Sequence, residues 1–280
     1  MPEARPAAVA RRMRPLLGTF VEVGAACAHG AHASAALDAA FGVLEACHAR
    51  WSFHAPDSEL SRLNRAPGVA VPVSAETLRL LRLARAFTRL SGGRFNFALG
   101  GELVCRGVLP DHGPAALVRI GQADDLQTGP GWARLLRPVR ITLDGIAKGY
   151  AVDLAVRALR RAGATGGWVN AGGDMRVFGD RTLPVQRREA DGRRVALGVL
   201  RCAAMASSRW GGAHDRSFPG CIVGGGPAPA QVVTVIAGTA WRADALTKVA
   251  ALSAPGERAA QVARLGGALV AGGAAAMVAA

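Results

Sequence analysis

The stretch ITLDGIAKGYAVD, residues 141–153, changes from strand-like to helix-like sequence around two glycines and a lysine. A helix that begins near Ile146 would point unpaired backbone N–H groups and the positive end of its dipole towards a ligand. Gly145 would let a phosphate approach the backbone, and Lys148 would add a positive charge, so the stretch can form a pyrophosphate cradle. It matches neither the Walker motif nor the dinucleotide fingerprint, and a plain strand–helix connection is the alternative.

A second candidate is ADALTKVA, in which Asp244, Thr247 and Lys248 share one face of a predicted helix at positions i, i+3 and i+4. The carboxylate and the hydroxyl offer the hard oxygen ligands that Mg²⁺ prefers, and Mg²⁺ often bridges phosphates. The alternative is structural, because Asp244 near the helix N-terminus would favour the helix dipole and pair with Lys248.

Two further stretches place polar residues near predicted turns. In NAGGDM, residues 170–175, two glycines before an acid predict a turn against which a ligand or another backbone packs, or else a β-bulge with a capping aspartate. In WSFHAPDSELSRLN, residues 51–64, Asp57 or Ser58 could cap a short helix. His54 in the same stretch could stack on a ring, titrate or be simply a polar loop residue.

The chain has 280 residues and a formal net charge of +14, which arginine mostly carries. Such an excess can indicate an anionic partner, for example a nucleotide, a nucleic acid or a membrane surface. The basic residues are scattered, and neither an aromatic-rich basic face nor a helix-turn-helix pattern is evident. We therefore expect a compositional bias with solvated arginines, and no nucleic-acid partner.

The cysteines and the chain ends bear on the cellular compartment. The five cysteines are odd in number and form neither a CxxC nor a Cys/His cluster, so we expect reduced core thiols. The N-terminus is basic but lacks the apolar core of a signal peptide, and the apolar C-terminal tail is broken by glycines. The prediction is a cytoplasmic protein without a membrane anchor.

Hydrophobic periodicity predicts a mixture of strands and helices. Helices are expected over residues 34–50, 74–90, 150–161, 243–253 and 255–267. Strands are expected at residues 19–25, twice within 133–145, across 166–179 with a glycine interruption, and at 195–200 and 232–238, with a loop over 211–229. The predicted class is α+β (mixed α/β): a flexible arm over residues 1–12, then a single domain over residues 13–280 with mixed sheets and flanking helices.

The order of these motifs resembles the FAD:protein FMN transferase family, often called ApbE-like. The resemblance covers about residues 14–260 and rests on LLGTFVEV, SFHAPDSELSRLN, GGRFNFALG, LDGIAKGYAVD, NAGGDMRVFG, MASSRW and ADALTKVAAL. It implies an ApbE-like fold that binds FAD and Mg²⁺, cleaves the FAD pyrophosphate, and transfers FMN to a Thr or Ser of an acceptor protein, releasing AMP. Metal and helix N-terminus would then stabilise the charge that grows on the phosphates.

The resemblance also implies residues that contact FAD. Leu17, Gly18 and Thr19 match the family's Met-Gly-Thr flavin contact, with Leu for Met, and His54 stands where the family often has a Tyr. The resemblance also implies that Phe95 and Asn96 line the FAD site, because they match a Phe-Asp segment of the family, with Asn for Asp. Thr142 stands where the family usually has an acidic residue, and Lys148 stands where the family has a lysine beside the nucleotide. Asp144 could supply the missing carboxylate, because residues two apart on a strand share a face.

For the metal, the resemblance implies the backbone carbonyl of Gly145, Asp244 as the principal carboxylate, and Thr247 and Lys248 beside it. The family usually has Thr at position 248. An ammonium there would repel Mg²⁺, unless it replaces part of the metal's charge or Thr247 becomes the ligand.

The predicted catalytic residues are Asp244, through the metal, and His214 as a candidate general base. The family has a His followed by Asp-Pro and Thr-Gly before its last core strand. Here the loop GGAHDRSFPGCIVGGGPAPAQ contains only the His214–Asp215 pair in other surroundings, and a solvated loop pair is the alternative. Two other functions therefore stay open: an FAD-binding module without transferase activity, and an FAD pyrophosphatase.

Overall fold

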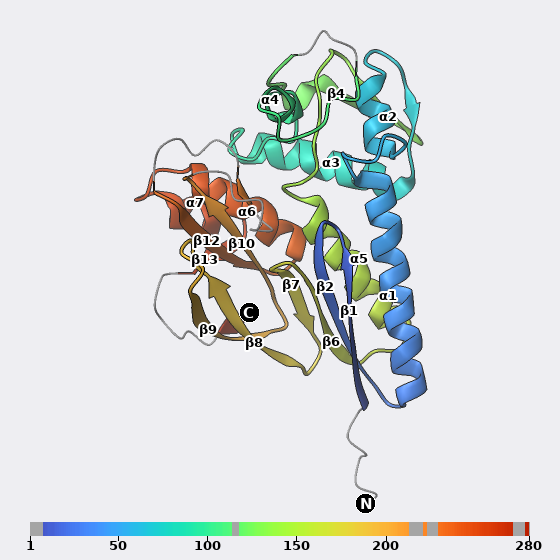
Figure 1. Ribbon diagram of the computed structural model, residues 1–280, viewed down its shortest axis with the longest axis vertical. Helices are drawn as coiled ribbons and strands as arrows, with labels where there is room; N and C mark the ends of the chain where they lie inside the picture. Colours follow the sequence, from blue (N-terminus) through green and yellow to red (C-terminus); the bar gives the residue numbers. More distant parts are fainter. Residues whose placement is uncertain (1–7, 114–117, 213–220, 223–228, 271–277, 280) are drawn as a thin grey trace, which may run out of the picture. The chain divides into compact units, whose positions relative to one another are not determined.

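The computed structural model describes residues 8–113, 118–212, 221–222, 229–270 and 278–279 (Figure 1). The chain divides into two compact units, which we call the sheet unit, residues 1–45 and 148–280, and the inserted unit, residues 46–147. This division by contacts does not test whether residues 13–280 form the single domain that the sequence predicted, so that domain stays a prediction.

A large and mostly antiparallel sheet forms the centre of the sheet unit. Its strands, in spatial order, are β1 (Ala8–Leu16), β2 (Thr19–Cys27), β6 (Gly166–Ala171), β7 (Asp174–Phe178), β10 (Ala204–Trp210), β12 (Gln231–Ala237) and β13 (Gly267–Leu269), with β11 (Cys221–Ile222) parallel to β10. A smaller sheet has the order β14 (Val278–Ala279), β9 (Arg194–Arg201) and β8 (Thr182–Arg188). Antiparallel sheets combined with helices confirm the predicted α+β class.

The helices that belong to the sheet unit or enter it are α1 (Gly30–Trp51), α5 (Ala147–Arg161), α6 (Ala240–Leu252) and α7 (Arg258–Arg264). Helix α6 packs against β10 and β12 and is buried over most of its length (Figure 1). Its sequence is apolar on nearly every side, which is typical of a helix enclosed by other elements. Two polar residues, Asp244 and Thr247, are therefore held in the interior.

Two hairpins end in two-residue turns with positive φ angles. Leu17 and Gly18 (φ 56° and 70°) join β1 to β2, and Gly172 and Gly173 (φ 63° and 103°) join β6 to β7. Such angles suit tight hairpin turns. A Cβ atom at Gly172 would lie 2.5 Å from Thr19 Oγ1, so the two tips pack together. The turn predicted in NAGGDM is confirmed, although it separates two strands where one interrupted strand was expected.

The inserted unit contains helices α2 (Glu59–Arg65), α3 (Ala75–Leu90) and α4 (Gly100–Cys105), a 3₁₀ turn (Ala123–Asp125), and a small sheet of β3 (Val71–Pro72), β5 (Trp132–Leu135) and β4 (Leu126–Gly129). Ser58 and Ser74 cap α2 and α3, because their hydroxyls accept the N–H groups of Ser61 (3.0 Å) and Thr77 (3.3 Å). Both predicted helix starts are confirmed.

The second strand predicted within residues 133–145 is wrong. Beyond β5 the described segment forms only an isolated bridge between Val118 and Val139. The backbone of Ile141 is satisfied by a side chain: Asn64 Nδ2 donates to its carbonyl (2.9 Å), and its N–H donates to Asn64 Oδ1 (2.8 Å). An amide thus replaces the neighbouring strand, so the apolar alternation does not produce a β-ladder.

The flexible arm predicted over residues 1–12 is wrong for residues 8–12, which pair with β2 as the start of β1. Two ion pairs fix this strand to α1, from Arg12 to Asp38 and from Arg14 to Glu45. The rest of the predicted arm, residues 1–7, lies outside the described residues.

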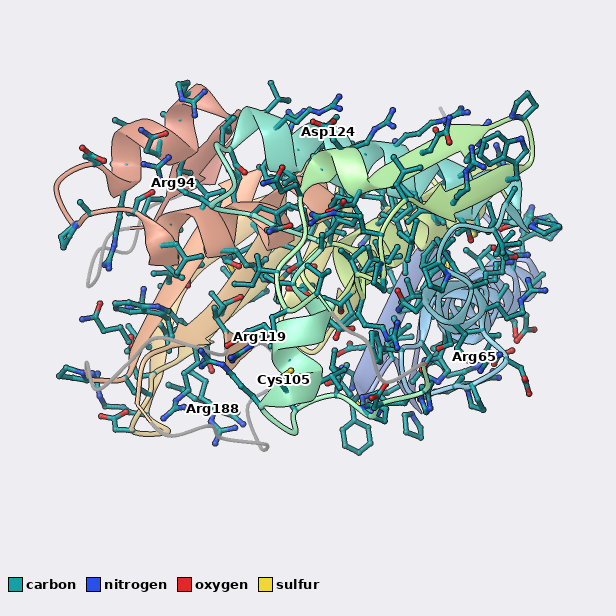
Figure 2. All side chains as sticks on the ribbon, turned by 90° about the horizontal axis from the view of Figure 1, so that it is seen from above. Arg65, Arg94, Cys105, Arg119, Asp124 and Arg188 are labelled. Atoms are coloured by element: carbon teal, nitrogen blue, oxygen red, sulfur yellow. The ribbon has the colours of Figure 1, made fainter. Side chains whose placement is uncertain are left out.

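The prediction of core thiols is only partly right. Cys27 and Cys47 are buried, but Cys105 at the end of α4 (Figure 2) and Cys202 are exposed. The two exposed thiols lie at element ends, where the apolar periodicity of the flanking helix or strand no longer applies.

Basic side chains come from many separate elements. The arginines labelled in Figure 2 include Arg65 in α2, Arg94 after α3 and Arg188 in β8. This origin agrees with the expected compositional bias, while the absence of a nucleic-acid partner stays a prediction. Within the described ranges, no helix combines the length and apolar character needed to cross a membrane.

Candidate functional site

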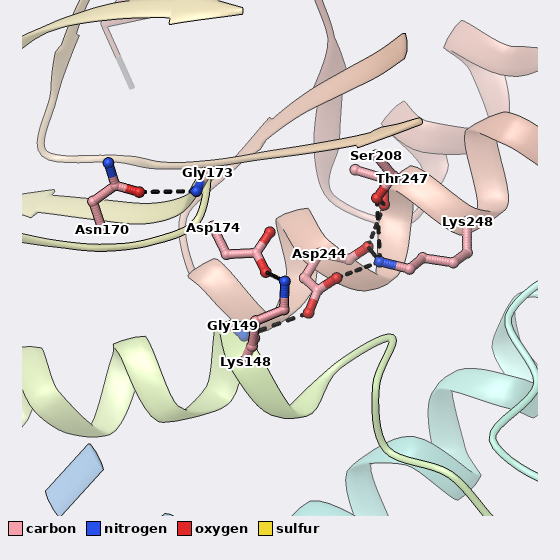
Figure 3. A network of polar contacts seen from close by, with 9 residues as sticks. All are labelled: Lys148, Gly149, Asn170, Gly173, Asp174, Ser208, Asp244, Thr247 and Lys248. Carbon is pink, nitrogen blue, oxygen red and sulfur yellow. Dashed lines mark hydrogen bonds and ion pairs between the residues drawn. The ribbon is translucent and has the colours of Figure 1, made fainter. Parts of the chain in front are cut away.

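Two lysine–carboxylate pairs lie in the sheet unit (Figure 3). Lys148 Nζ, on α5, is 3.2 Å from Asp174 Oδ2 on β7, and Lys248 on α6 pairs with Oδ1 of Asp244 one helical turn earlier. The lysine side chains are 18% and 19% exposed, whereas the carboxylate side chains are 5% and 2% exposed. We call these four residues the lysine site: two buried negative charges, each covered by a more accessible positive charge.

Helices α5 and α6 approach each other closely at Gly149. A Cβ atom at this position would overlap the carbonyl of Ala240, so only glycine fits. The N–H of Gly149 points at Asp244 Oδ2, at 3.4 Å. This contact joins the two lysine–carboxylate pairs into one network. It also means that the cradle predicted at the start of α5 is partly filled by a carboxylate of the protein itself.

The N-terminus of α6 is capped by Asp153 from α5. Its two oxygens accept the N–H groups of Ala240 and Trp241, each at 3.0 Å, and Arg176 Nη1 donates to Oδ1 at 2.6 Å. Burial raises the pKa of Asp153, while Arg176 and the two N–H groups act against that rise. The dipole end of α6 is therefore already satisfied within the protein.

Lys248 is surrounded by oxygen atoms. Its ammonium donates to Asp244 Oδ1, to the Asp244 carbonyl (3.2 Å) and to Ser208 Oγ (3.3 Å), which together use its three N–H donors. Thr247 donates its hydroxyl to the same carbonyl (2.7 Å), so at the 2.7 Å contact between the two hydroxyls Ser208 is the donor. The i, i+4 pairing that the sequence offered as a structural alternative is present.

Ser208 has a place that the sequence did not predict. It lies on β10, in the quoted motif MASSRW, and contacts α6 across 40 residues of sequence. The sequence indicated only that side chains alternate along β10, so that every second one points to the same face of the sheet. Without the order of strands in the sheet, that face could not be matched to α6.

Asp174 has the most perturbed environment in the lysine site. Burial and then the negative charge of Asp244 raise its pKa to about 6, while Lys148 and Lys248 lower it. The turn before it is held by Asn170, whose Oδ1 accepts the N–H of Gly173 at 3.0 Å (Figure 3). Strongly perturbed carboxylates cluster at functional sites, which makes this network the candidate site.

The lysine site does not fit Mg²⁺ as it is arranged. Mg²⁺ requires near-octahedral oxygen ligands at about 2.0–2.1 Å. Oδ1 of Asp244 meets the ammonium of Lys248, and Oδ2 meets the N–H of Gly149. The hydroxyl of Thr247 is buried and hydrogen-bonded to the Asp244 carbonyl and to Ser208. Across the part of the chain that the structure describes, no three His, Cys, Asp or Glu residues gather in a way that could hold a metal ion.

The model of the ApbE family matches residues 17–270, which is most of the chain and includes the whole lysine site. The chain belongs to the ApbE family. The match confirms the resemblance seen in the ordered motifs.

Named relatives of this ApbE-family chain include two bacterial proteins called FAD:protein FMN transferase. The chain is 33% identical to the Rhodobacter capsulatus protein over 182 residues, which cover 59% of this chain and 34% of that one. It is 26% identical to the Haemophilus influenzae protein over 153 residues, which cover 49% and 44%. The matched part therefore spans less than half the length of each curated relative.

The fold is also that of a solved ApbE protein. The structure from Thermotoga maritima is 22% identical, with a TM-score of 0.77, and the match covers 94% of this chain and 93% of that one. At this identity the likeness shows the fold alone.

The FAD contacts predicted for the ApbE-family chain fall in both units. In the sheet unit, Leu17, Gly18 and Thr19 form the tip of the β1–β2 hairpin. Leu17 holds a left-handed φ of 56°, which costs a non-glycine residue about 1 kcal/mol or more. In the inserted unit, Phe95 is buried, with its ring 5.5 Å from that of Phe87 in an edge-to-face contact.

The other predicted residues of the inserted unit have their own local contacts. Asn96 donates to the Gly121 carbonyl (3.1 Å) and accepts the Ala98 N–H (2.8 Å), and His54 is exposed. Thr142 donates to Asp144 Oδ2 at 3.0 Å, so these two side chains do meet, but next to a turn and not on the strand face that was expected. Gly145 lies between them and the start of α5. The roles of these residues towards FAD stay predictions, and His214 and Asp215 lie outside the described residues.

A cavity elsewhere in the sheet unit has a volume of about 430 Å³. Its lining includes Arg187, Glu189 and Arg258, but none of the predicted site residues. Arg187 and Glu189 already pair with each other at 2.6 Å. Size alone therefore does not make this cavity the candidate site, because the acidic residue in its lining, Glu189, is already paired with Arg187.

Proposed function

We propose that this ApbE-family chain is an FAD:protein FMN transferase, which moves FMN from FAD to a Thr or Ser hydroxyl of an acceptor protein and releases AMP. The observation that carries the proposal is the lysine site, in which Lys148 and Lys248 present positive charge above buried carboxylates. A diphosphate is the part of FAD that such a site would bind. Two relatives named for this reaction support the choice of FAD as the donor.

The reaction needs charge neutralisation more than covalent chemistry from the protein. The acceptor oxygen forms a bond to the FMN phosphorus while the bond from that phosphorus to the AMP oxygen breaks. The hydroxyl proton passes to a base, for which His214 is the proposed residue. Lys148 would bind the diphosphate and stabilise the negative charge that the departing AMP phosphate gains. Because the lysine site does not fit Mg²⁺, no step in this scheme uses a metal.

The remaining parts of the proposal concern partners and location. The partner is a flavin-accepting protein with a Thr or Ser acceptor, and neither a nucleic acid nor a membrane anchor in this chain is needed. A cytoplasmic location is also part of the proposal.

The direct test is AMP release from FAD by the purified protein, followed by a flavin fluorescence scan of a denaturing gel run with candidate acceptors. AMP that appears together with a fluorescent acceptor band would support the transferase. AMP with free FMN and no labelled protein would instead identify a pyrophosphatase. FAD binding without AMP in any condition would identify a flavin-binding module.

Replacing Lys148 tests the diphosphate contact. We expect Lys148→Met to weaken FAD binding about tenfold or more, because a charge-assisted contact to phosphate is lost. Arg157→Met is the matched control, since it removes a positive charge from an exposed position on the same helix. Titration of FAD by flavin fluorescence measures both. Equal affinity in Lys148→Met and the control would remove Lys148 from the site.

A further inference from the structure

The two lysines of the candidate site have an unusual place in the composition of the chain. Lys148 and Lys248 are the only lysines among 34 lysine and arginine residues in the sequence. All the other residues in this group are arginines, so these two positions depart from the arginine-rich composition of the chain. An ammonium is a compact point charge, whereas a guanidinium is a planar fork that needs more space. At these two positions the chain therefore presents a compact, nearly spherical cation.

The surroundings of Lys248 are those of a cation site. Its Nζ is held by a carboxylate oxygen and a backbone carbonyl, both from Asp244, and by the hydroxyl of Ser208 (Figure 3). Carboxylate, carbonyl and hydroxyl oxygens are the ligands that hard metal ions take in proteins. Here the protein's own ammonium has filled the position, with one N–H for each oxygen.

Occupation by Lys248 and by a divalent ion exclude each other. Asp244 is 2% exposed, and its other oxygen faces the N–H of Gly149. A metal on Asp244 would lie within a few ångströms of the ammonium, where two positive charges in a poorly solvated site repel strongly. Thr247 cannot take over as ligand without giving up its hydrogen bonds to the Asp244 carbonyl and Ser208.

We propose that the ammonium of Lys248 replaces the divalent cation of this site, so that the chain excludes Mg²⁺ from Asp244 and binds FAD without it. The identity of the ligand rests on the proposed function, but the exclusion of Mg²⁺ does not. The ammonium neutralises Asp244, so that carboxylate no longer repels an incoming diphosphate, and no metal is needed for this purpose.

The exclusion is tested by calorimetric titration with Mg²⁺ alone, in the absence of flavin. The wild type should bind no Mg²⁺ at Asp244. Lys248→Thr frees Oδ1 of Asp244 and adds a hydroxyl, so it should gain one Mg²⁺ site. Lys248→Met is the matched control, because it removes the same charge but offers no oxygen, and it should gain weaker binding or none. Mg²⁺ binding by the wild type that Lys248→Thr does not improve would overturn the proposal.

FAD titrations of the same three proteins test the consequence for the ligand. The wild type should bind FAD equally in Mg²⁺ and in EDTA. Lys248→Met should bind about tenfold more weakly or worse in both, because Asp244 keeps its charge. Lys248→Thr should recover affinity only with Mg²⁺. Thermal unfolding and circular dichroism of each variant verify that it is folded.

The two proposals fail in different ways. A wild type that loses FAD affinity in EDTA would overturn the replacement of the metal by Lys248. A wild type that binds no FAD in any condition would overturn the proposed function, and the Mg²⁺ titration would still decide whether Lys248 holds the cation position.

Discussion

Asp174 in the sheet unit and Asp125 in the inserted unit are both buried carboxylates with a basic partner, yet their pKa values move in opposite directions. Arg137 donates to both oxygens of Asp125, at 2.5 Å and 2.7 Å, and the N–H of Gln122 adds a third bond at 2.7 Å. The hydrogen bonds from Arg137 lower the pKa of Asp125. Its charge is stabilised by the fold.

Asp174 is in the opposite situation. It has one ion pair, at 3.2 Å from Lys148, and a second buried carboxylate nearby, and its pKa rises to about 6. A raised pKa alone does not mark a site, because burial also raises that of Asp153, whose oxygens cap α6. What separates Asp174 is that, among the contacts of the described residues, no backbone N–H group donates to its carboxylate. A carboxylate kept at a net electrostatic cost is expected where function, rather than stability, selects it.

The largest effect on stability should come from Arg140 in the inserted unit. Its side chain is 1% exposed, donates to the Asn64 carbonyl at 2.8 Å, and fills the space where a Cβ on Gly113 would lie. Arg140→Met should lower the free energy of unfolding by about 2 to 4 kcal/mol, because that carbonyl loses a partner and the packing changes. Urea denaturation measures this. An unchanged midpoint would show that buried charge in the inserted unit is not structural.

A smaller, pH-dependent effect is expected from Asp174→Asn. Because the folded pKa of Asp174, about 6, lies above its unfolded value, its contribution to stability is fully present below about pH 4 and is lost as the pH rises through 6. The wild type should therefore lose up to about 3 kcal/mol of unfolding free energy between pH 4 and pH 7 through the ionisation of Asp174. Asp174→Asn cannot ionise at this position and should not show this loss. Unfolding of both proteins across this range gives the difference, in which the contribution of Asp153 cancels. Parallel curves would contradict the raised pKa.

Local sequence predicted the parts of the site that depend on short spacings. The Asp244–Lys248 pair follows from one helical turn, and the helix after Lys148 follows from apolar periodicity. The contacts that complete the site join distant residues. Ser208 meets Lys248 across 40 residues and Asp153 meets the start of α6 across 87, so both depend on which strands and helices are neighbours. That order is set by the packing of the whole sheet unit and not by any local pattern.

Distance in the sequence also explains the strand that was predicted wrongly. Asn64 binds both backbone groups of Ile141 across 77 residues, which no periodicity in residues 133–145 could reveal. Conversely, the metal site was expected from the family resemblance, and the departure at position 248 was visible in the sequence. The geometry decides between the two interpretations, because the side chain of Lys248 pairs with Asp244 as the helical spacing allowed.

The smallest effect, and the sharpest contrast with Asp174, is expected from Asp125→Asn. Since the folded pKa of Asp125 lies below its unfolded value, its contribution is present above about pH 4 and is lost as the pH falls through the folded pKa. Arg137 is 48% exposed, so solvent screens the pair and the contribution should stay below about 1 kcal/mol. The unfolding free energy of the wild type minus that of Asp125→Asn should therefore fall towards acid. The same difference for Asp174→Asn should fall towards neutral pH, where the ionised Asp174 destabilises the wild type but not the variant. If both differences changed in the same direction with pH, the two carboxylates would have the same electrostatic character, and the contrast that singles out the lysine site would fail.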